Sequence, residues 1–151
     1  MRFHSTSRSH DLCACLDEDL DGDAFVGPLR EAGIDLVRHR ESFSKGVADV
    51  VWIPLVAEQG LIILSANTGM RLKPLEVAAT RDAGARVLYL RQTRNTTHPQ
   101  LAALFIRSIR RVERFFALRV GPRVGALKQL SHGRDPLRLA PGEIEVPSAF
   151  R

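Results

Sequence analysis

Residues 41–67 read ESFSKGVADVVWIPLVAEQGLIILSAN, and this stretch decides the fold. Its first half predicts a helix with Asp49 near its start, and the apolar run 60–64 predicts a buried strand. That strand ends at two polar residues, Ser65 and Asn67. In an open α/β sheet, ligands collect outside the carboxyl ends of the strands, so we expect Asp49 and these two side chains to face one crevice.

A second group of acids, Asp17, Glu18 and Asp19, follows the apolar run 12–16 in the same relation. Carboxylates that converge at strand ends repel one another unless a cation neutralises them. Sites built only from oxygen ligands suit hard divalent ions such as Mg²⁺ or Mn²⁺. The pattern therefore predicts a small metal-dependent α/β domain.

Composition limits the class of protein. The chain has 151 residues, 44% of them hydrophobic, which fits one domain with a sizeable core. It contains no apolar run of membrane-spanning length and its first residues lack the apolar centre of a signal peptide, so we expect a cytoplasmic protein. Cys13 and Cys15 have the spacing of one strand face, which suits small buried residues better than a disulfide.

The charge is unevenly distributed along the chain. Residues 11–49 hold ten Asp or Glu against four Lys or Arg, whereas residues 91–138 hold eleven Lys or Arg against two acids. An enzyme that uses a metal on a polyanion needs such an arrangement, since cations hold the phosphates while carboxylates hold the metal. A solvated charged face or an acidic protein partner would explain the same distribution.

The remaining elements follow from apolar runs separated by turn residues. We expect strands over 12–16, 34–38, 61–64 and 87–90, an edge strand within 120–127, helices over 24–32 and 73–83, and a loop over 39–48. Leu75, Ala78 and Ala79 are expected to face inward from the helix 73–83. This alternation predicts a three-layer α/β/α sandwich with a central, mainly parallel sheet at 11–130, an N-terminal extension at 1–10 and a polar, proline-containing tail at 131–151.

Pro54 indicates where the helix after the loop begins. Because a proline costs little only in the first turn of a helix, we expect this helix to start near Val50 to Trp52. Asp49 then lies at or near the N-cap, where backbone N–H groups and the helix dipole favour an aspartate. Capping alone would explain Asp49, and it does not exclude a role as a metal ligand.

The longest predicted helix begins near His98 and carries two different faces. Its apolar stripe is formed by Leu101, Leu104, Phe105, Ile109, Val112 and Phe116. Its other side carries Arg107, Arg110, Arg111 and Arg114. The stripe predicts packing on the sheet. The arginines are either a solvated face or a binding surface for phosphate groups.

The order of these motifs resembles the PIN-like domains that are grouped with VapC-type toxins. The resemblance covers roughly residues 12–127 and rests on the segments LDEDL at 16–20, LREAGI at 29–34, DVVWIP at 49–54, GLIILS at 60–65 and PLE at 74–76. It implies a three-layer α/β/α fold with an acidic pocket that binds Mg²⁺ or Mn²⁺ and hydrolyses RNA. It further implies that Asp17, Asp49 and position 67 are the metal ligands, and that the partners are RNA, a cognate antitoxin protein and a second copy of the chain.

The resemblance breaks at position 67. The family pattern has Thr-x-Asp where this chain reads Ser65-Ala66-Asn67. An amide oxygen still binds a hard cation, but the pocket loses one negative charge and with it metal affinity. We therefore expect a weakened or inactive ribonuclease, in which Asn67 is either natural or an inactivating substitution.

Other residues have supporting roles in this hypothesis. Glu18, Asp19 and Glu76 are candidates to hold outer-shell waters or a second ion, and Ser65 supplies the hydroxyl of the motif. Arg71 and Lys73 follow the third strand and are candidates to contact substrate phosphate. The first alternative is a catalytically inactive PIN-like module that binds an antitoxin or RNA. A receiver-like phosphoacceptor domain is the second, although neither an acceptor Asp after the third strand nor a Lys after Leu90 is present.

Overall fold

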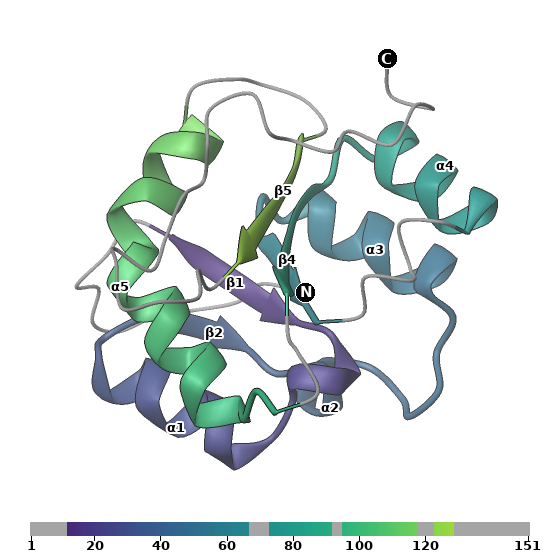
Figure 1. Cartoon of the computed structure of the whole chain (residues 1–151). Helices are drawn as coiled ribbons and strands as arrows, with labels where there is room; N and C mark the ends of the chain where they lie inside the picture. Colours follow the sequence, from purple (N-terminus) through teal and green to yellow (C-terminus); the bar gives the residue numbers. More distant parts are fainter. Residues whose placement is uncertain (1–11, 67–72, 92–94, 118–122, 129–151) are drawn as a thin grey trace.

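The computed structural model describes residues 12–66, 73–91, 95–117 and 123–128 (Figure 1). Its strands are β1 (Cys13–Leu16), β2 (Asp35–Val37), β3 (Ile62–Ser65), β4 (Arg86–Arg91) and β5 (Arg123–Lys128). Its helices are η1 (Glu18–Leu20, a 3₁₀ helix), α1 (Asp23–Glu31), α2 (His39–Ser42), α3 (Asp49–Glu58), α4 (Pro74–Asp82) and α5 (His98–Ala117). The predicted sandwich is confirmed.

All five strands are parallel, in the order β2-β1-β3-β4-β5. From β1 the chain first moves outward to β2 and then returns past β1 to β3 on the other side. The neighbouring carboxyl ends of β1 and β3 therefore form the point where the strand order reverses, and ligands of open α/β sheets bind at such a point. The N–H of Asp17 donates to the carbonyl of Leu64 at 2.8 Å and joins these two strand ends.

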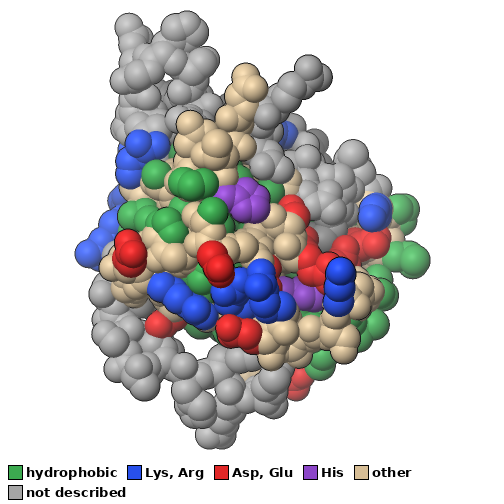
Figure 2. Space-filling model, turned by 90° about the horizontal axis from the view of Figure 1, so that it is seen from below, with side chains coloured by type: hydrophobic (Ala, Val, Ile, Leu, Met, Phe, Trp, Pro, Cys, Tyr) green, Lys and Arg blue, Asp and Glu red, His purple; other side chains and the backbone are tan. Residues whose placement is uncertain are grey.

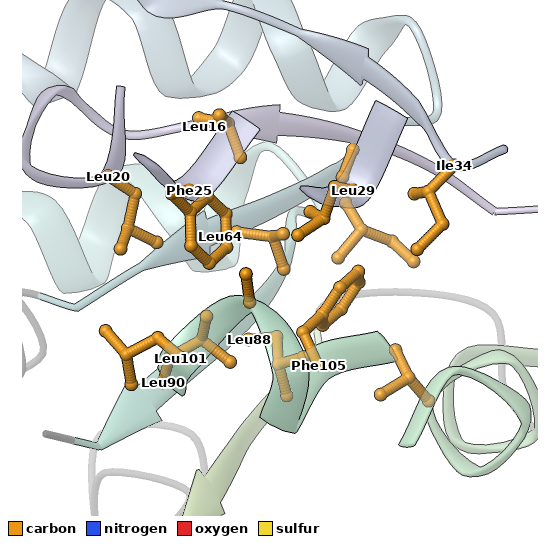
Figure 3. Packing of buried hydrophobic residues seen from close by; sticks show 14 of the residues in the cluster. Leu16, Leu20, Phe25, Leu29, Ile34, Leu64, Leu88, Leu90, Leu101 and Phe105 are labelled. Carbon is orange, nitrogen blue, oxygen red and sulfur yellow. The ribbon is translucent and has the colours of Figure 1, made fainter. Parts of the chain in front are cut away.

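The two faces of the sheet bury separate apolar clusters. Ala14 and Leu16 of β1 point to the face covered by α1 and α5, whereas Cys15 between them points to the face covered by α3. Figure 3 shows Phe25 and Leu29 of α1 meeting Phe105 of α5 over the sheet. The predicted apolar stripe of α5 is buried along its whole length. Successive side chains of β1 thus point to opposite faces of the sheet, and each face is covered by its own layer of helices.

Three local predictions are wrong. Residues His39–Ser42 form the short helix α2 within the expected loop. Helix α3 begins at Asp49, so Pro54 is its sixth residue and lies inside the helix, beyond the first turn. A proline there removes one intrahelical hydrogen bond, and α3 persists because its buried Trp52, Ile53 and Val56 hold it on the sheet.

The third error concerns the orientation of α4. Leu75 is 72% exposed instead of inward, Ala78 and Ala79 are only half-buried, and the buried residues are Val77 and Thr80. Pro74 is the first residue of the helix, and the side that packs on the neighbouring α3 contains Val77 and Thr80 at helical spacing. The sequence of α4 gives the helix two possible inward sides, and only tertiary packing determines which of them is buried.

Neither Cys13 nor Cys15 forms a disulfide. Burial first, and then the nearby charge of Asp17, raise the pKa of Cys15 to about 12, so its thiol stays protonated. Within the described ranges, no helix has the length and apolar content needed to span a membrane.

Candidate active site

Asp17 directly follows β1 and lies at the reversal point of the sheet. Its side chain is buried, and both of its carboxylate oxygens accept hydrogen bonds. Oδ1 accepts from the backbone N–H of Glu18 at 2.7 Å, and Oδ2 accepts from the hydroxyl of Ser65 at 2.9 Å. Ser65 is the last residue of β3, so the two strand ends fix this carboxylate from both sides.

Asp19 lies one turn further, in η1. Its Oδ2 accepts a hydrogen bond from the N–H of Ala66 at 3.0 Å, which docks η1 against the end of β3. The side chain remains accessible to solvent on its other side. The short η1 helix therefore holds a second carboxylate next to Asp17.

Asp49 is the first residue of α3, and Ala48 is the N-cap, with no side-chain cap. Oδ1 of Asp49 accepts a hydrogen bond from the indole N–H of Trp52 at 2.9 Å. Trp52 is fully buried in the core and so gives the carboxylate a fixed support. Since the carboxylate faces Trp52 and caps no backbone N–H in this geometry, a capping hydrogen bond does not account for Asp49, although its place in the first turn still suits the helix dipole.

These carboxylates line one pocket of about 220 Å³, whose walls are Asp17, Glu18, Asp19, His39, Gly46, Val47, Asp49 and Trp52. We call it the acidic pocket. It lies at the carboxyl ends of β1 and β3, where the strand order reverses.

The charges in the acidic pocket are poorly compensated. Burial raises the pKa of Asp17, and the charge of Asp49 adds to the effect, against the hydrogen bonds from Ser65 and Glu18. Burial and the charge of Asp17 raise the pKa of Asp19 to about 7, although solvent on its open side screens part of this interaction. Mutual repulsion of this kind is what a bound cation relieves.

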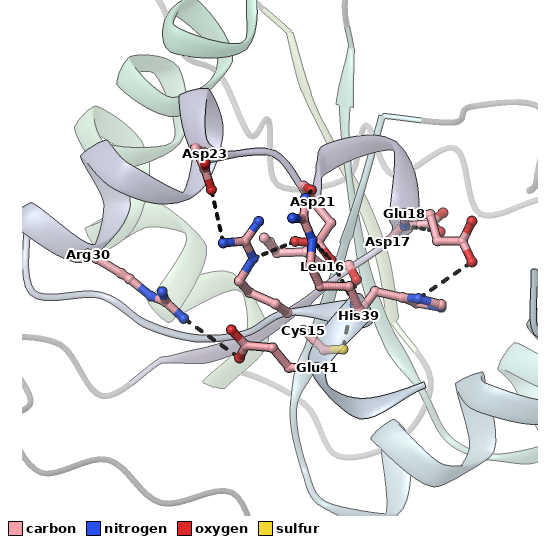
Figure 4. Close-up of polar contacts among 11 residues, drawn as sticks. Cys15, Leu16, Asp17, Glu18, Asp21, Asp23, Arg30, His39 and Glu41 are labelled. Carbon is pink, nitrogen blue, oxygen red and sulfur yellow. Dashed lines mark hydrogen bonds and ion pairs between the residues drawn. The ribbon is translucent and has the colours of Figure 1, made fainter. Parts of the chain in front are cut away.

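Asp21, at the other end of η1, has opposite surroundings (Figure 4). Its Oδ1 accepts from Nε of Arg38 at 2.7 Å, and its Oδ2 accepts from the N–H of Arg40 at 2.8 Å. Burial would raise its pKa, but the Arg40 N–H and the Arg38 guanidinium lower it overall. Arg38 also contacts Asp23 at 3.0 Å. Asp21 is thus a structural carboxylate that joins η1 to the end of β2.

A family model for a PIN-like domain matches residues 14–92, more than half of the chain. The chain belongs to the PIN-like domain family. The matched segment runs from β1 to the residue after β4 and includes Asp17, Asp49 and position 67. The search of curated proteins and the search of solved structures returned no significant match. Family membership confirms the resemblance to PIN-like domains and leaves the receiver-like alternative without support.

The PIN-like domain also places a histidine at the acidic pocket, which sequence reasoning missed. His39 is buried, and its ring packs against Phe43 and Trp52 at centroid distances of 5.2 and 5.3 Å. Its Nδ1 lies 3.5 Å from Oε1 of Glu18 (Figure 4). The same oxygen also accepts from the N–H of Gly46 at 2.9 Å. The sequence contains only a weak signal for this contact, since Phe43 and Trp52 follow His39 by four and thirteen positions and His39 was expected in a loop.

The other candidate residues lie elsewhere. Lys73 is exposed just before α4, Glu76 is half-buried in its first turn, and neither lines the acidic pocket. Asn67 and Arg71 lie outside the described residues. In the described ranges, no three His, Cys, Asp or Glu side chains form a ready-made metal cluster.

The arginines of α5 lie away from the acidic pocket. The first residue of α5, His98, packs beside Phe25 and Gly22 at the start of α1, near the carboxyl end of the sheet. From there the helix runs back along the sheet, so Arg107 lies roughly 13 Å along its axis and Arg114 roughly 24 Å. These residues are exposed or half-buried on the outer side, as expected, but form a surface separate from the acidic pocket.

Proposed function

We propose that this PIN-like domain is a metal-dependent ribonuclease that hydrolyses RNA phosphodiesters, and that Asn67 weakens its activity. The nuclease-type fold of the family supports it. The observation that carries the proposal is the convergence of Asp17, Asp19 and Asp49 on one pocket, where burial first, and then the neighbouring carboxylates, raise the pKa of Asp17 and Asp19. Three carboxylates held together without a matching number of cations are typical of a functional site.

The residues present fit Mg²⁺ or Mn²⁺. The donors of the pocket are carboxylate oxygens, and Mg²⁺ in particular is bound through one or two carboxylates, with waters and substrate phosphates completing its shell. Asp17 and Asp49 are the residues that would hold the ion, with Asp19 close by for its waters. A site of this type needs no cluster of three protein ligands in the absence of substrate. When bound, the ion would polarise a phosphoryl oxygen and lower the pKa of a water.

The contribution of the chain itself is orientation. Ser65 and the N–H of Glu18 fix both oxygens of Asp17, Trp52 fixes Asp49, and the N–H of Ala66 fixes Asp19. Each carboxylate keeps further lone pairs for a ligand. The buried Trp52 also closes the floor of the pocket against the core. Such supports restrict the carboxylates before substrate arrives, which lowers the cost of assembling the site.

A gel assay with labelled single-stranded RNA and Mn²⁺ tests this function. We expect cleavage to increase from the Asp49→Asn variant to the wild type to the Asn67→Asp variant, since each step adds a carboxylate to the site. Asn67→Asp with an added Asp49→Asn substitution is the matched control for a contaminating nuclease. If the Asn67→Asp variant neither binds Mn²⁺ nor cleaves RNA, the proposal is wrong.

A second candidate function is a catalytically inactive PIN-like module that binds a partner protein, such as an antitoxin or a second copy of the chain. Besides Asn67, the exposed apolar side chains of α3 and α4 favour it: Val50, Val51, Leu55 and Leu75 are 39%, 51%, 47% and 72% exposed. A contact surface for a protein would explain them. Mn²⁺ affinity separates the two functions, since a module of this kind does not need it.

A further inference from the structure

A second pocket, of about 400 Å³, adjoins the acidic pocket. It is lined by Glu18, Asp21, His39, Arg40, Phe43 and Lys45. We call it the basic-aromatic pocket. Glu18 and His39 line both pockets, so the two cavities share a wall and lie side by side at the carboxyl end of the sheet.

The basic-aromatic pocket differs from the acidic pocket because two basic side chains, Arg40 and Lys45, line it beside the acids Glu18 and Asp21. The guanidinium of Arg40 contacts Asp21, with Nε 3.4 Å from Oδ2, and Nη2 donates to the Asp21 carbonyl. Asp21, Asp23, Arg38 and Arg40 form one cluster with two acids and two guanidinium groups, so its net charge is zero. The Arg40 side chain is nevertheless 59% exposed, and its remaining N–H groups can donate to a phosphate. Lys45 is exposed and forms no ion pair among the described residues. Figure 2 shows Lys and Arg side chains beside Asp and Glu side chains at this end of the molecule.

Phe43 adds an aromatic surface to these cations. It is half-buried, and its ring is supported by His39 at 5.2 Å and by Trp52 at 6.1 Å between centroids. Proteins that bind single-stranded nucleic acids combine cationic side chains for the backbone with supported aromatic rings on which bases stack. A nucleotide offers both a phosphate and a base, whereas an acidic peptide would use only the cations.

We propose that the basic-aromatic pocket binds the nucleotide next to the scissile phosphodiester of single-stranded RNA, with its phosphate on Arg40 and Lys45 and its base on Phe43. This inference rests on the proposed function, since the shared wall of Glu18 and His39 places a nucleotide here directly beside the acidic pocket. It deepens that function by assigning strand binding to Arg40 of α2 and to Phe43 and Lys45 just after it rather than to the arginines of α5.

Fluorescence anisotropy with labelled hexauridine tests the assignment, in Mn²⁺ and in EDTA. We expect Phe43→Leu to weaken binding about fivefold or more, because one stacked base is lost. We expect Lys45→Ala to weaken binding a few-fold and to reduce the salt slope of the logarithm of affinity by about 0.7, because one phosphate contact is lost. Arg81→Ala, which removes an exposed charge on α4, is the matched control and should leave both quantities unchanged.

Several outcomes would overturn the inference. One is a wild-type protein that does not bind hexauridine, and another is an Arg81→Ala variant as weak as Lys45→Ala. A third is equal affinity of Lys45→Ala, Phe43→Leu and wild type. Lys45 is exposed, so its substitution leaves the fold intact even if Phe43→Leu does not. Deoxythymidine hexamers show whether RNA is preferred, and equal binding of both would overturn the choice of RNA.

Failure of the proposed function looks different. If the Asn67→Asp variant neither binds Mn²⁺ nor cleaves RNA, the ribonuclease proposal is wrong. Binding of hexauridine in EDTA does not need the metal, so it still tests the basic-aromatic pocket. Conversely, an active Asn67→Asp variant whose RNA affinity does not respond to Lys45→Ala or Phe43→Leu would keep the nuclease and remove the strand-binding pocket.

Discussion

Asp17 and Asp21 lie four residues apart, at the two ends of η1, and both are buried, with 7% and 9% of their surface exposed. Yet the pKa of Asp17 is raised and that of Asp21 is lowered. Asp21 has Arg38 and Arg40 as partners, whereas Asp17 accepts hydrogen bonds from the neutral donors Glu18 N–H and Ser65. Burial and the charge of Asp49 raise the pKa of Asp17 against these bonds and a smaller lowering by His39. One residue type thus serves two purposes: a paired carboxylate stabilises the fold, and an uncompensated one is available to a ligand.

The largest expected effect is on the paired side of this comparison. Arg38→Met keeps the length of the side chain but leaves the buried Asp21 with Arg40 as its remaining partner, which costs on the order of 3 kcal/mol of unfolding free energy, the lower end for a broken buried pair. The melting temperature should fall by about 6–12 °C. Asp17→Asn should change the unfolding free energy by less than about 1 kcal/mol, because the Ser65 hydroxyl can turn and accept from the new amide. Thermal denaturation followed by circular dichroism measures both.

The double variant Asp21→Asn with Arg38→Met is the control for lost packing. It removes the unpaired charge and should recover much of the stability that Arg38→Met loses. The penalty should also shrink when the pH falls toward the ordinary aspartate value, since a protonated Asp21 needs no cation. If Asp17→Asn destabilises as much as Arg38→Met does, then Asp17 is structural too and the comparison fails.

The sequence predicted the surroundings of Asp17, the carboxylate without an arginine partner, better than those of Asp21, the carboxylate paired with arginine. An acid directly after an apolar run, in a chain of alternating strands and helices, already places Asp17 at a strand end, since parallel strands end at one edge. Asp49 follows from the same logic applied to α3. The Ser65 hydroxyl was also expected near these acids because β3 ends there.

The paired side depends on contacts that no local pattern encodes. Arg38 reaches Asp21 across 17 positions in the chain, and that contact requires the β1–β2 register, in which Cys15 pairs with Val37. His39 became part of the site only through α2, a four-residue helix too short to leave a periodic signal. The predicted start of α3 was wrong because tertiary packing tolerates Pro54 inside the helix. The predicted orientation of α4 was wrong because the helix had two possible apolar sides, one of which contained Leu75.

The next largest effect concerns metal binding by Asp17. Asp17→Asn should weaken Mn²⁺ binding about tenfold or more, because ligand charge largely sets affinity for hard cations. Trp52 is the only tryptophan of the chain and its indole N–H is bonded to Asp49, so its fluorescence reports on the pocket. Asp82→Asn, at an exposed position in α4, removes the same charge elsewhere and should leave the Mn²⁺ titration unchanged. Equal affinity in all three proteins would contradict the assignment of Asp17.

Adding charge should sharpen the comparison further. Asn67→Asp should tighten Mn²⁺ binding on the order of tenfold, since it restores the third carboxylate of the family pattern. Asn and Asp are nearly isosteric and both suit turns, so a merely structural Asn67 predicts no change. Asn95→Asp makes the same chemical change at an exposed position after β4 and is the matched control. Isothermal titration calorimetry compares the three proteins, and identical affinities would argue against position 67 as a ligand.

The smallest expected effect is the pH dependence of stability without metal. The raised pKa values of Asp17 and Asp19 mean that the folded state keeps protons that the unfolded state has already lost. In the window from the ordinary value near 3.8 to about 7, rising pH removes these protons at the expense of the folded state, so their contribution to stability decreases and then levels off. Asp21, with its lowered pKa, acts in the opposite direction but only below its ordinary value, outside this window.

The melting temperature in EDTA should therefore fall from pH 5 to pH 7, and Asp19→Asn should flatten this slope because an amide does not titrate. Asp82→Asn should keep the wild-type slope. Saturating Mn²⁺ should reverse the trend, since the ion binds the deprotonated carboxylates and gains affinity as they lose protons. A slope that is the same with and without Mn²⁺ would mean that the repulsion between Asp17, Asp19 and Asp49 is not what a cation relieves. The difference between Asp17 and Asp21 would then be one of pairing with arginine alone.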